Sequence, residues 1–291
     1  MMVKLIIFCS LLLFLSLSVS ALQYTENSEE TCTLEGICTA TIYSYQKYYQ
    51  ENNQWNEINE NIGTENCQPG YQYCVNNNLY QAHFKNTYDA PLITHDTDQI
   101  SSKMVALEGF ALNAPQAVIE GNTITYKDII NGVDLRYTYL PTKLKEEIII
   151  KDKSFIASVQ GDLDLAFAFN SYGAALVSDE KSVKTSTFVM NDLVAYDHGI
   201  SGVGLPFSLQ DNMFMMSVPL SWLMNESTIY PVIIDPSFAI NVSLATDLYV
   251  ERSATIPVTY IRTITDRVLI AGVPCDPMPC PNNPHRIGMD W

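Results

Sequence analysis

The sequence predicts an all-β protein, built as an antiparallel β-sandwich-like domain or as two packed β subdomains. Short stretches of alternating apolar and polar residues recur along the chain, separated by turns rich in Gly, Asn and Asp. Helical spacing of apolar residues is not sustained anywhere for long. The composition agrees, because 47% of the residues are hydrophobic and 17 are tyrosines, a residue enriched in strands.

The first element is a secretory signal peptide over residues 1–21. Lys4 supplies its positive charge, Leu5 to Leu17 form its apolar core, and Val19-Ser20-Ala21 is a small-residue cleavage site. We therefore expect the protein to be secreted or displayed on the cell surface. No later stretch is apolar for 18 residues, so we expect no transmembrane anchor after signal cleavage.

Cysteine usage fits export. Without Cys9 the chain keeps an even number of cysteines, which in an exported protein favours disulfides. The local pairing that we predict is Cys32–Cys38, Cys67–Cys74 and Cys275–Cys280. Zinc binding is the alternative, and the spacings, with no histidine pair near them, speak against it.

The region after the signal is expected to be an N-terminal β subdomain over residues 22–114. Thr39 to Asn59 reads as a hairpin that turns at Glu51-Asn52-Asn53, and Leu79 to Phe84 reads as a strand. Ala114-Pro115 precedes the next strand, Ala117 to Ile119, and marks the boundary with a central β-sandwich subdomain over 115–240.

The central subdomain is organised around a long hairpin between Thr123 and Lys153. Its two strands alternate apolar and polar residues on either side of a turn at Leu140 to Lys143. The register that keeps the apolar side chains on one face places these pairs opposite each other: Val133 and Ile150, Leu135 and Ile148, Tyr139 and Leu144.

The same register makes predictions for three charged residues. Arg136 lies opposite Glu147 on the polar face, where the two form a cross-strand ion pair. Glu146 falls on the apolar face beside Tyr137. An unpaired carboxylate there is costly, so we expect a structural, hydrogen-bonded role for Glu146 rather than a catalytic one.

The hairpin also carries a family resemblance. The segment ITYKDIINGVDLRYTYLPTKLKEEIII, together with Tyr48 to Asn59 and Tyr230 to Ser237, resembles the N-terminal β-rich region of large secreted bacterial and archaeal surface proteins. In those proteins this region stands upstream of DNRLRE-type or wall-associated repeat modules. The resemblance implies a β-rich extracellular building block, in a family whose functions are mostly unassigned.

Short strands are expected to follow the hairpin. They cover Phe155–Val159, Leu163–Phe169, Ala174–Leu176, Thr187–Met190, Leu193–Tyr196 and Met213–Leu220. Ser221 to Met224 is long enough for a single helical turn. This spacing of short strands is typical of antiparallel sandwiches.

Residues 241–291 are expected to begin a further β module. From Asp247 onward the chain resembles the opening of the modules that follow this region in the surface proteins, although the DNRLRE motif itself is absent. Val268 to Ile270, Ile287, Met289 and Trp291 would stay exposed without more strands. Our hypothesis is that a longer natural product or a partner chain completes this sheet by strand addition.

Charge limits the classes of partner. The formal net charge of −16 argues against binding of nucleic acid or anionic membranes, which require a basic patch. His95, Asp96 and Asp98 form the most polar cluster, a weak candidate for Ca²⁺ with an exposed acidic turn as the alternative. Apart from this Ca²⁺ candidate, we expect no cofactor.

Motifs for chemistry and modification are few. The sequence contains no HExxH, GxGxxG or P-loop motif, and Ser201 does not match a serine-hydrolase elbow. Asn225 and Asn241 each begin an N-glycosylation sequon.

Two function classes follow from these observations. The first is a secreted or cell-surface structural or adhesive β module without catalytic activity, whose partners are other surface proteins or glycans. The alternative is a secreted carbohydrate-binding protein or hydrolase that uses an acidic, tyrosine-rich cleft. Carboxylates and aromatic residues gathered in one concave pocket would favour the alternative, and dispersed ones the first class.

Overall fold

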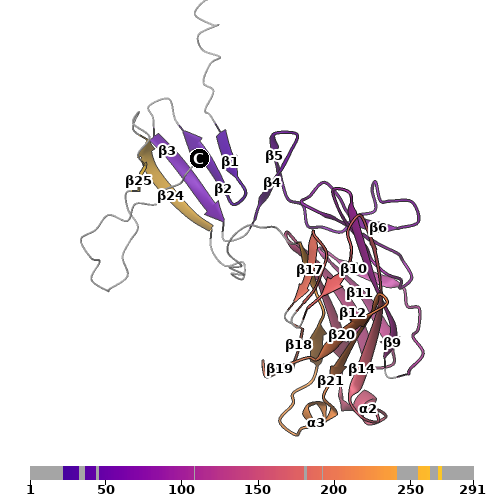
Figure 1. Cartoon of the computed structure of the whole chain (residues 1–291). Helices are drawn as coiled ribbons and strands as arrows, with labels where there is room; N and C mark the ends of the chain where they lie inside the picture. The colour runs from indigo at the N-terminus through magenta and orange to yellow at the C-terminus, as the bar shows by residue number, and fades with distance from the viewer. Residues whose placement is uncertain are drawn as a thin grey trace, which may run out of the picture. The chain divides into compact units, whose positions relative to one another are not determined.

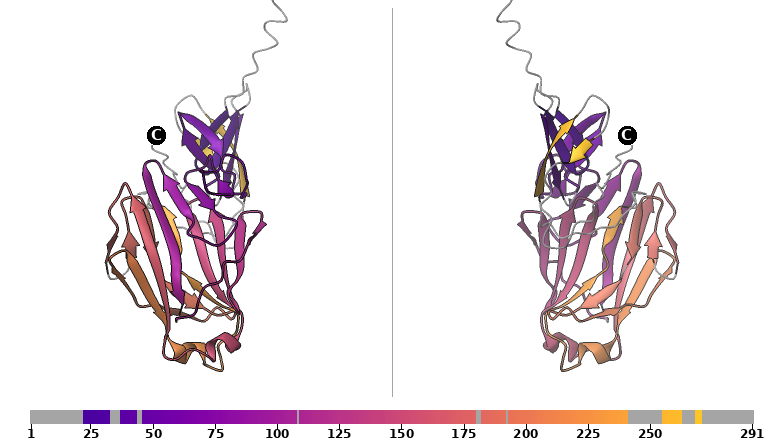
Figure 2. Two further views of the ribbon diagram at one scale, coloured as in Figure 1. Left: turned by 90° about the vertical axis from the view of Figure 1, so that its right-hand side faces the viewer. Right: turned by 90° about the vertical axis from the view of Figure 1, so that its left-hand side faces the viewer.

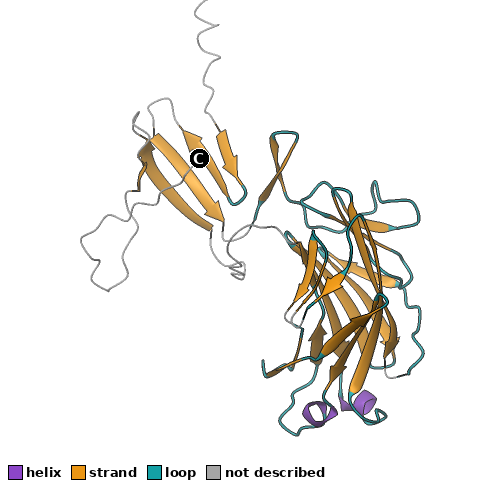
Figure 3. Cartoon of the chain, viewed as in Figure 1, coloured by secondary structure: helices purple, strands orange, loops and turns teal. Residues whose placement is uncertain are grey.

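The computed structural model describes residues 22–32, 37–43, 46–107, 109–179, 182–191, 193–240, 255–262 and 268–270. The chain divides into two compact units, one from residues 1–48 and 249–291 and the other from Tyr49 to Leu248. Strands dominate both units, and two short helices lie in the larger one (Figures 1 and 3). The expected all-β fold is confirmed.

The smaller unit is a five-stranded antiparallel sheet made from both ends of the chain. Its strand order is β1-β2-β3-β24-β25. The strands are β1 (Leu22–Thr25), β2 (Ser28–Cys32), β3 (Ile37–Tyr43), β24 (Thr255–Arg262) and β25 (Val268–Ile270). β24 pairs with β3 from Thr255–Tyr43 to Ile261–Ile37.

This pairing corrects our expectation for the C-terminal region. β24 finds its neighbour near the N-terminal end of the same chain, and β24 and β25 extend the sheet of β1, β2 and β3 instead of starting a separate module. Ile287, Met289 and Trp291 lie outside the described residues. A pattern of short strands cannot reveal this pairing, because its two strands are separated by the whole larger unit.

A tyrosine cluster lies at one end of the smaller sheet. The Glu29 carboxylate accepts hydrogen bonds from the Tyr43 hydroxyl at 2.9 Å and from the Tyr48 hydroxyl at 2.6 Å. The Lys47 ammonium lies 4.2 Å from the centre of the Tyr43 ring and donates to its hydroxyl at 2.8 Å. The Tyr24 ring packs 4.9 Å from that of Tyr48. These contacts hold β1, β2 and the end of β3 together.

The larger unit contains two large antiparallel sheets. The seven-stranded sheet has the order β20-β21-β14-β9-β8-β7-β6. Its strands are β6 (Tyr73–Val75), β7 (Gln81–Phe84), β8 (Leu92–His95), β9 (Asp98–Leu107), β14 (Leu163–Tyr172), β20 (Phe207–Gln210) and β21 (Met213–Val218).

The second sheet has eleven strands. Its main path is β10-β11-β12-β13-β23-β17-β16-β15, and β22, β18 and β19 branch from β13. These strands are β10 (Ala117–Glu120), β11 (Thr123–Ile130), β12 (Val133–Leu140), β13 (Lys143–Ile150), β15 (Val177–Ser178), β16 (Ser182–Lys184), β17 (Phe188–Asn191), β18 (Val194–Tyr196), β19 (Gly202–Gly204), β22 (Val232–Asp235) and β23 (Phe238–Ile240). A separate hairpin is formed by β4 (Tyr48–Glu51) and β5 (Gln54–Glu57).

The two large sheets pack face to face around one hydrophobic core. Aromatic rings from opposite sheets meet there: the Phe84 and Tyr137 ring centres lie 5.8 Å apart, and those of Phe169 and Phe238 lie 5.4 Å apart. The two turned views of Figure 2 show the strands of this unit side by side along its length. Burial of these inward faces is the main force that holds the sandwich together.

The predicted register of the central hairpin is confirmed. β12 and β13 pair from Val133–Ile150 to Leu140–Lys143, with Leu135 opposite Ile148. Leu135, Ile148 and the other apolar side chains of this face are buried in the core. The period of two in the sequence therefore fixed both the pairing and the buried face.

Two of the predicted strands are wrong. The stretch after the hairpin forms the short helix α2 (Lys153–Ile156), capped by the Asp152 side chain, and not a strand over Phe155–Val159. Ala174–Leu176 is not a strand either, because β15 begins at Val177. The single helical turn near Ser221 is confirmed as α3 (Leu220–Leu223).

The predicted division at 114/115 also differs from the structure. The boundary falls between β9 and β10, which belong to different sheets but to the same compact unit. β14, β20 and β21 return to the sheet of β6–β9, so neither sheet is continuous in sequence. Residues 49–114 and 115–240 therefore belong to one compact unit, and both contribute strands to the seven-stranded sheet.

In the described part of the chain, the predicted Cys67–Cys74 disulfide is formed, with a Cα separation of 5.4 Å. Cys32 lies directly opposite Cys38 across β2 and β3, which is compatible with the predicted local bridge. Cys275 and Cys280 lie outside the described residues. In the same part of the chain, no helix has the length and apolar character needed to span a membrane.

Candidate functional site

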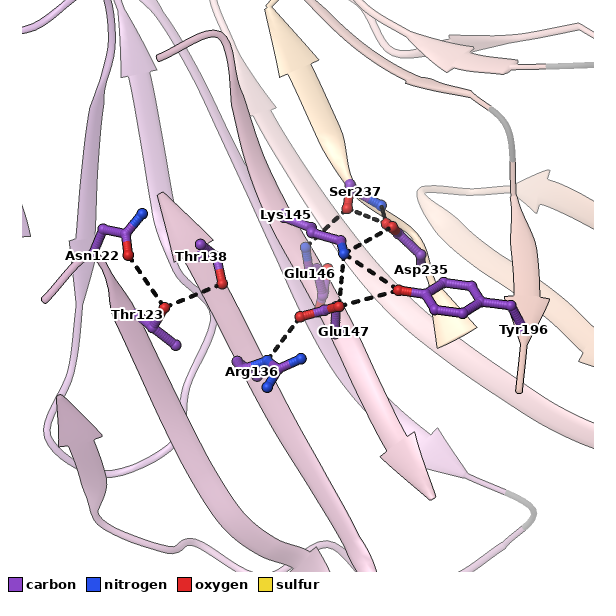
Figure 4. Close-up of polar contacts among 10 residues, drawn as sticks. All are labelled: Asn122, Thr123, Arg136, Thr138, Lys145, Glu146, Glu147, Tyr196, Asp235 and Ser237. Carbon is purple, nitrogen blue, oxygen red and sulfur yellow. Dashed lines mark hydrogen bonds and ion pairs between the residues drawn. The ribbon is translucent and has the colours of Figure 1, made fainter. Parts of the chain in front are cut away.

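A network of charged and polar side chains lies on the outer face of the eleven-stranded sheet. Alternation along β12 and β13 places Arg136, Lys145 and Glu147 on this face, since Ile148 and Ile150 point into the core. β22 pairs with β13 and β18 pairs with β22, which brings Asp235 and Tyr196 beside them. The five side chains come from β12, β13, β22 and β18, and Figure 4 shows how they lie toward one another.

Glu147 is the centre of this cluster. One carboxylate oxygen accepts from the Arg136 Nε at 2.8 Å. The other accepts from the Lys145 Nζ at 2.7 Å and from the Tyr196 hydroxyl at 3.2 Å. Only 4% of the Glu147 side chain is exposed, so its carboxylate is largely shielded from solvent in the ion pair with Arg136.

The electrostatics of the cluster favour the charged forms. Burial of the Glu147 carboxyl raises its pKa, but the hydrogen bonds from Arg136 and Lys145 outweigh burial and leave the pKa below its ordinary value. Burial lowers the pKa of Lys145, and its contact with Glu147 more than reverses that effect and raises it. Asp235 lies 4.0 Å from the Lys145 Nζ. The predicted Arg136–Glu147 pair is confirmed, within a larger network.

Glu146 points into the core from the same strand. Its side chain is buried and accepts a hydrogen bond from the Tyr137 hydroxyl at 2.8 Å, as the register predicted. Its backbone N–H donates to the Ser237 hydroxyl at 3.0 Å, and that hydroxyl contacts the Asp235 carboxylate. Burial, together with the nearby Asp235, raises the pKa of Glu146 to about 8, against the opposing effect of the hydrogen bond from Tyr137.

The position of these two carboxyls limits their chemistry. Glu146 and Glu147 are consecutive in one strand, so their side chains leave the sheet on opposite faces. Glycoside hydrolysis needs two carboxyl groups that flank one bond of a bound substrate. A pair with one member in the core and the other on the outer face does not meet that requirement.

The residues proposed for Ca²⁺ do not form a ligand set. His95 and Asp98 face each other across the β8–β9 turn, and Asp96 lies in the turn with an exposed side chain. The Asp98 carboxylate accepts from the Ser186 hydroxyl at 3.1 Å and from that of Thr187. Among the residues that the structure describes, no group of three or more His, Cys, Asp or Glu side chains is arranged to hold a metal ion.

The two glycosylation candidates fall in different situations. Asn225 is exposed in the turn after α3, where its side-chain oxygen accepts from the Ser227 backbone N–H at 2.9 Å and from its hydroxyl at 2.8 Å. Asn241 lies outside the described residues. Exposure makes Asn225 accessible to a modifying enzyme.

Sequence reasoning missed three members of the polar cluster: Lys145, Tyr196 and Asp235. Alternation within the hairpin places Lys145 on the outer face, and this signal was available. No signal in a single sequence shows that β22 and β18 lie next to β13, because such pairings depend on the fold of the whole sandwich. A scan against protein-family models finds no match, and searches of curated proteins and of solved structures find none either.

Proposed function

We propose that this protein is a secreted or cell-surface structural or adhesive β module without catalytic activity. The signal-like N-terminus, the Cys67–Cys74 disulfide and the resemblance of the central hairpin to surface-protein segments support this role. The continuous sandwich core supports it as well, since such a core suits a rigid building block.

One observation carries the proposal. In the outer-face cluster, the charges of Arg136, Lys145 and Glu147 are turned toward each other and toward Tyr196 and Asp235. A binding or catalytic cleft directs its charged groups toward a ligand, whereas this network joins four strands of one sheet. The network therefore cross-links strands of the sheet and has a structural role.

A glycan array with the mature protein tests the proposal, together with a hydrolysis assay on the same glycans. We expect no specific glycan signal and no turnover. Arg136→Ala should lower the melting temperature, because it leaves the buried Glu147 without one of its partners. A clean glycan hit that Tyr196→Phe and Arg136→Lys abolish without loss of folding would contradict the proposal and favour carbohydrate binding.

A further inference from the structure

Most sheet edges in the larger unit are protected. The outer side of β6 is covered by Gly63, which exchanges two backbone hydrogen bonds of 2.9 Å with Cys74. At one end of β10 the Ala117 N–H donates to the Asn86 carbonyl, and just past the other end the Gly121 carbonyl accepts from the Ile62 N–H. β15 and β19 are only two and three residues long. Short or covered edges are the usual protection against unwanted strand pairing.

β20 is the exception. It is four uncharged residues long, and in the described structure its one neighbour is β21. The hairpin turns at Asp211 and Asn212, both with positive φ, so Gln210 and Met213 form the first hydrogen-bonded pair. The backbone bond from Ser217 to Pro206 continues that alternation. It follows that the backbone groups of Phe207 and Leu209 point away from β21.

These outward backbone groups lack a hydrogen-bond partner among the described residues. No backbone or side-chain group of the described residues bonds to the N–H or C=O of Phe207 or Leu209. The two residues are half-buried, while Ser208 and Gln210 beside them are exposed. The edge therefore offers two donors and two acceptors to a further strand.

Two exposed methionines lie on β21, the strand behind this edge. On the outer face of the sheet, Met213 and Met215 are 37% and 46% exposed. They lie opposite Ala168 and Ala166 of β14, whose small side chains leave the methionines standing above the surface. Flexible methionine side chains on a surface adapt to a range of apolar partners.

The charge around the edge has one sign. The sequence contains no Lys or Arg between Lys184 and Arg252, and none in β14, so β14, β20 and β21 have no cationic residue. Asp162, Asp164 and Asp211 are exposed there. A second copy of this chain would bring the same acidic residues and the same net charge of −16, which opposes self-pairing.

We propose that β20 accepts an extended segment of a partner protein by antiparallel or parallel strand addition, and that the segment combines alternating apolar residues with flanking basic residues. The outward backbone groups of Phe207 and Leu209 would provide the hydrogen bonds. The half-buried side chains of Phe207 and Leu209 would contact the apolar side chains of the added segment, and the three aspartates would select for basic flanks. This inference rests on the proposed structural or adhesive role and names the chemistry of its partner.

The probe for this site is a short synthetic peptide of alternating valine and threonine with a lysine at each end, labelled with a fluorophore. We expect the full-length protein to bind it with a dissociation constant in the micromolar to millimolar range, as for a small interface. Hydrogen exchange at the Phe207 and Leu209 amides should slow when the peptide is bound.

Two variants separate the edge from the fold. Leu209→Pro removes an N–H that points away from β21, so it should abolish binding and keep the fold. The double variant Ser208→Lys with Gln210→Lys changes exposed side chains only, and it should weaken binding by about tenfold or more. Gln50→Lys with Gln54→Lys makes the same change of net charge in the exposed β4–β5 hairpin and should leave binding unaltered.

Several results would overturn the proposal. They are no binding by the unmodified protein, equal binding by a folded Leu209→Pro variant, and equal binding of a peptide with aspartate in place of lysine. A dimer that Leu209→Pro dissociates would assign the edge to a second copy. The glycan array and the hydrolysis assay do not depend on β20, so failure here is distinguishable from failure of the proposed function.

Discussion

Buried tyrosine hydroxyls provide the polar part of an otherwise apolar core. The Tyr139 hydroxyl donates to the Tyr80 carbonyl at 2.7 Å, and the Tyr80 hydroxyl donates to the Leu140 carbonyl at 3.0 Å. The Tyr126 hydroxyl donates to the Lys85 carbonyl at 2.6 Å. Each bond joins residues that are far apart in sequence. Since an unpaired buried hydroxyl is costly, these bonds help to specify one arrangement of the two sheets.

Glu146 should make stability depend on pH. The pKa of Glu146 in the folded protein is about 8, above the ordinary value of 4.5. The contribution of Glu146 to the free energy of unfolding is therefore fully present below about pH 4.5 and is lost as pH rises through 8. We expect the free energy of unfolding to fall by a few kcal/mol between these limits. Glu146→Gln keeps an acceptor for Tyr137 and should remove most of this dependence, as measured by urea unfolding from pH 5 to pH 9.

Glu147→Gln is the matched control on the same strand. The pKa of the Glu147 carboxyl lies below its ordinary value, so its effect on the pH dependence of stability has the opposite sign. The stabilisation by Glu147 is present above that ordinary value and is lost as pH falls. Glu147→Gln should therefore destabilise the protein at neutral pH and leave the alkaline decline in place. If both variants changed the pH profile in the same direction, the assignment of Glu146 to the core would be wrong.

At the scale of elements, the central hairpin is the best-determined part of the fold. Its eight cross-strand pairs run without a register shift, and it contributes both a core face and three residues of the outer-face network. β11 pairs with β12 on the other side, with a β-bulge between Tyr126 and Ile130. The hairpin is thus the element whose side chains most directly test the register.

Substitutions on its two faces should differ sharply. Leu135→Asp or Ile148→Asp places an unpaired charge in the core and should destabilise the protein by about 4 kcal/mol or more, so that little folded protein is recovered. Asp134→Ser or Lys151→Ser removes a partly exposed ion pair of 2.7 Å and should cost about 1 kcal/mol or less. The yield of folded protein and the melting temperature measure both effects, and similar behaviour of all four variants would contradict the register.

The sequence allowed prediction of what alternation and turns determine. These are the β12–β13 register, the buried Glu146, the Arg136–Glu147 pair and the local Cys67–Cys74 bridge. It did not allow prediction of the sheet partners, because β13 meets β22 and β3 meets β24 through packing of distant segments. The strand expected over Phe155–Val159 failed for a local reason: Asp152 caps a helical turn whose Phe155 and Ile156 are buried.

At the scale of the whole molecule, the chain passes back and forth between the two large sheets. β6–β9 lie in one, β10–β13 in the other, and β14 returns to the first. The many contacts between distant segments predict slow, cooperative folding of the larger unit.

Fragments test this organisation. Residues 49–248 contain both sheets and their core, so this fragment should fold and unfold in one cooperative transition. Residues 49–114 lack β14, the strand that pairs with β9, and should stay unfolded. Circular dichroism and thermal melting show whether each fragment folds. A folded 49–114 fragment would support the subdomain boundary expected at Ala114.

The ladder between β3 and β24 has a mechanical consequence. The larger unit is joined to it at the Tyr43–Thr255 end, while the rest of the chain leaves from the Ile37–Ile261 end. Tension along the chain from both sides acts first on the edge strands β1 and β25 and then on the β3–β24 pairs from their Ile37–Ile261 end, so the hydrogen bonds of the small sheet open in sequence. The sandwich comes under load only after the last pair has opened. In the proposed adhesive role, the small sheet would yield first and spare the core.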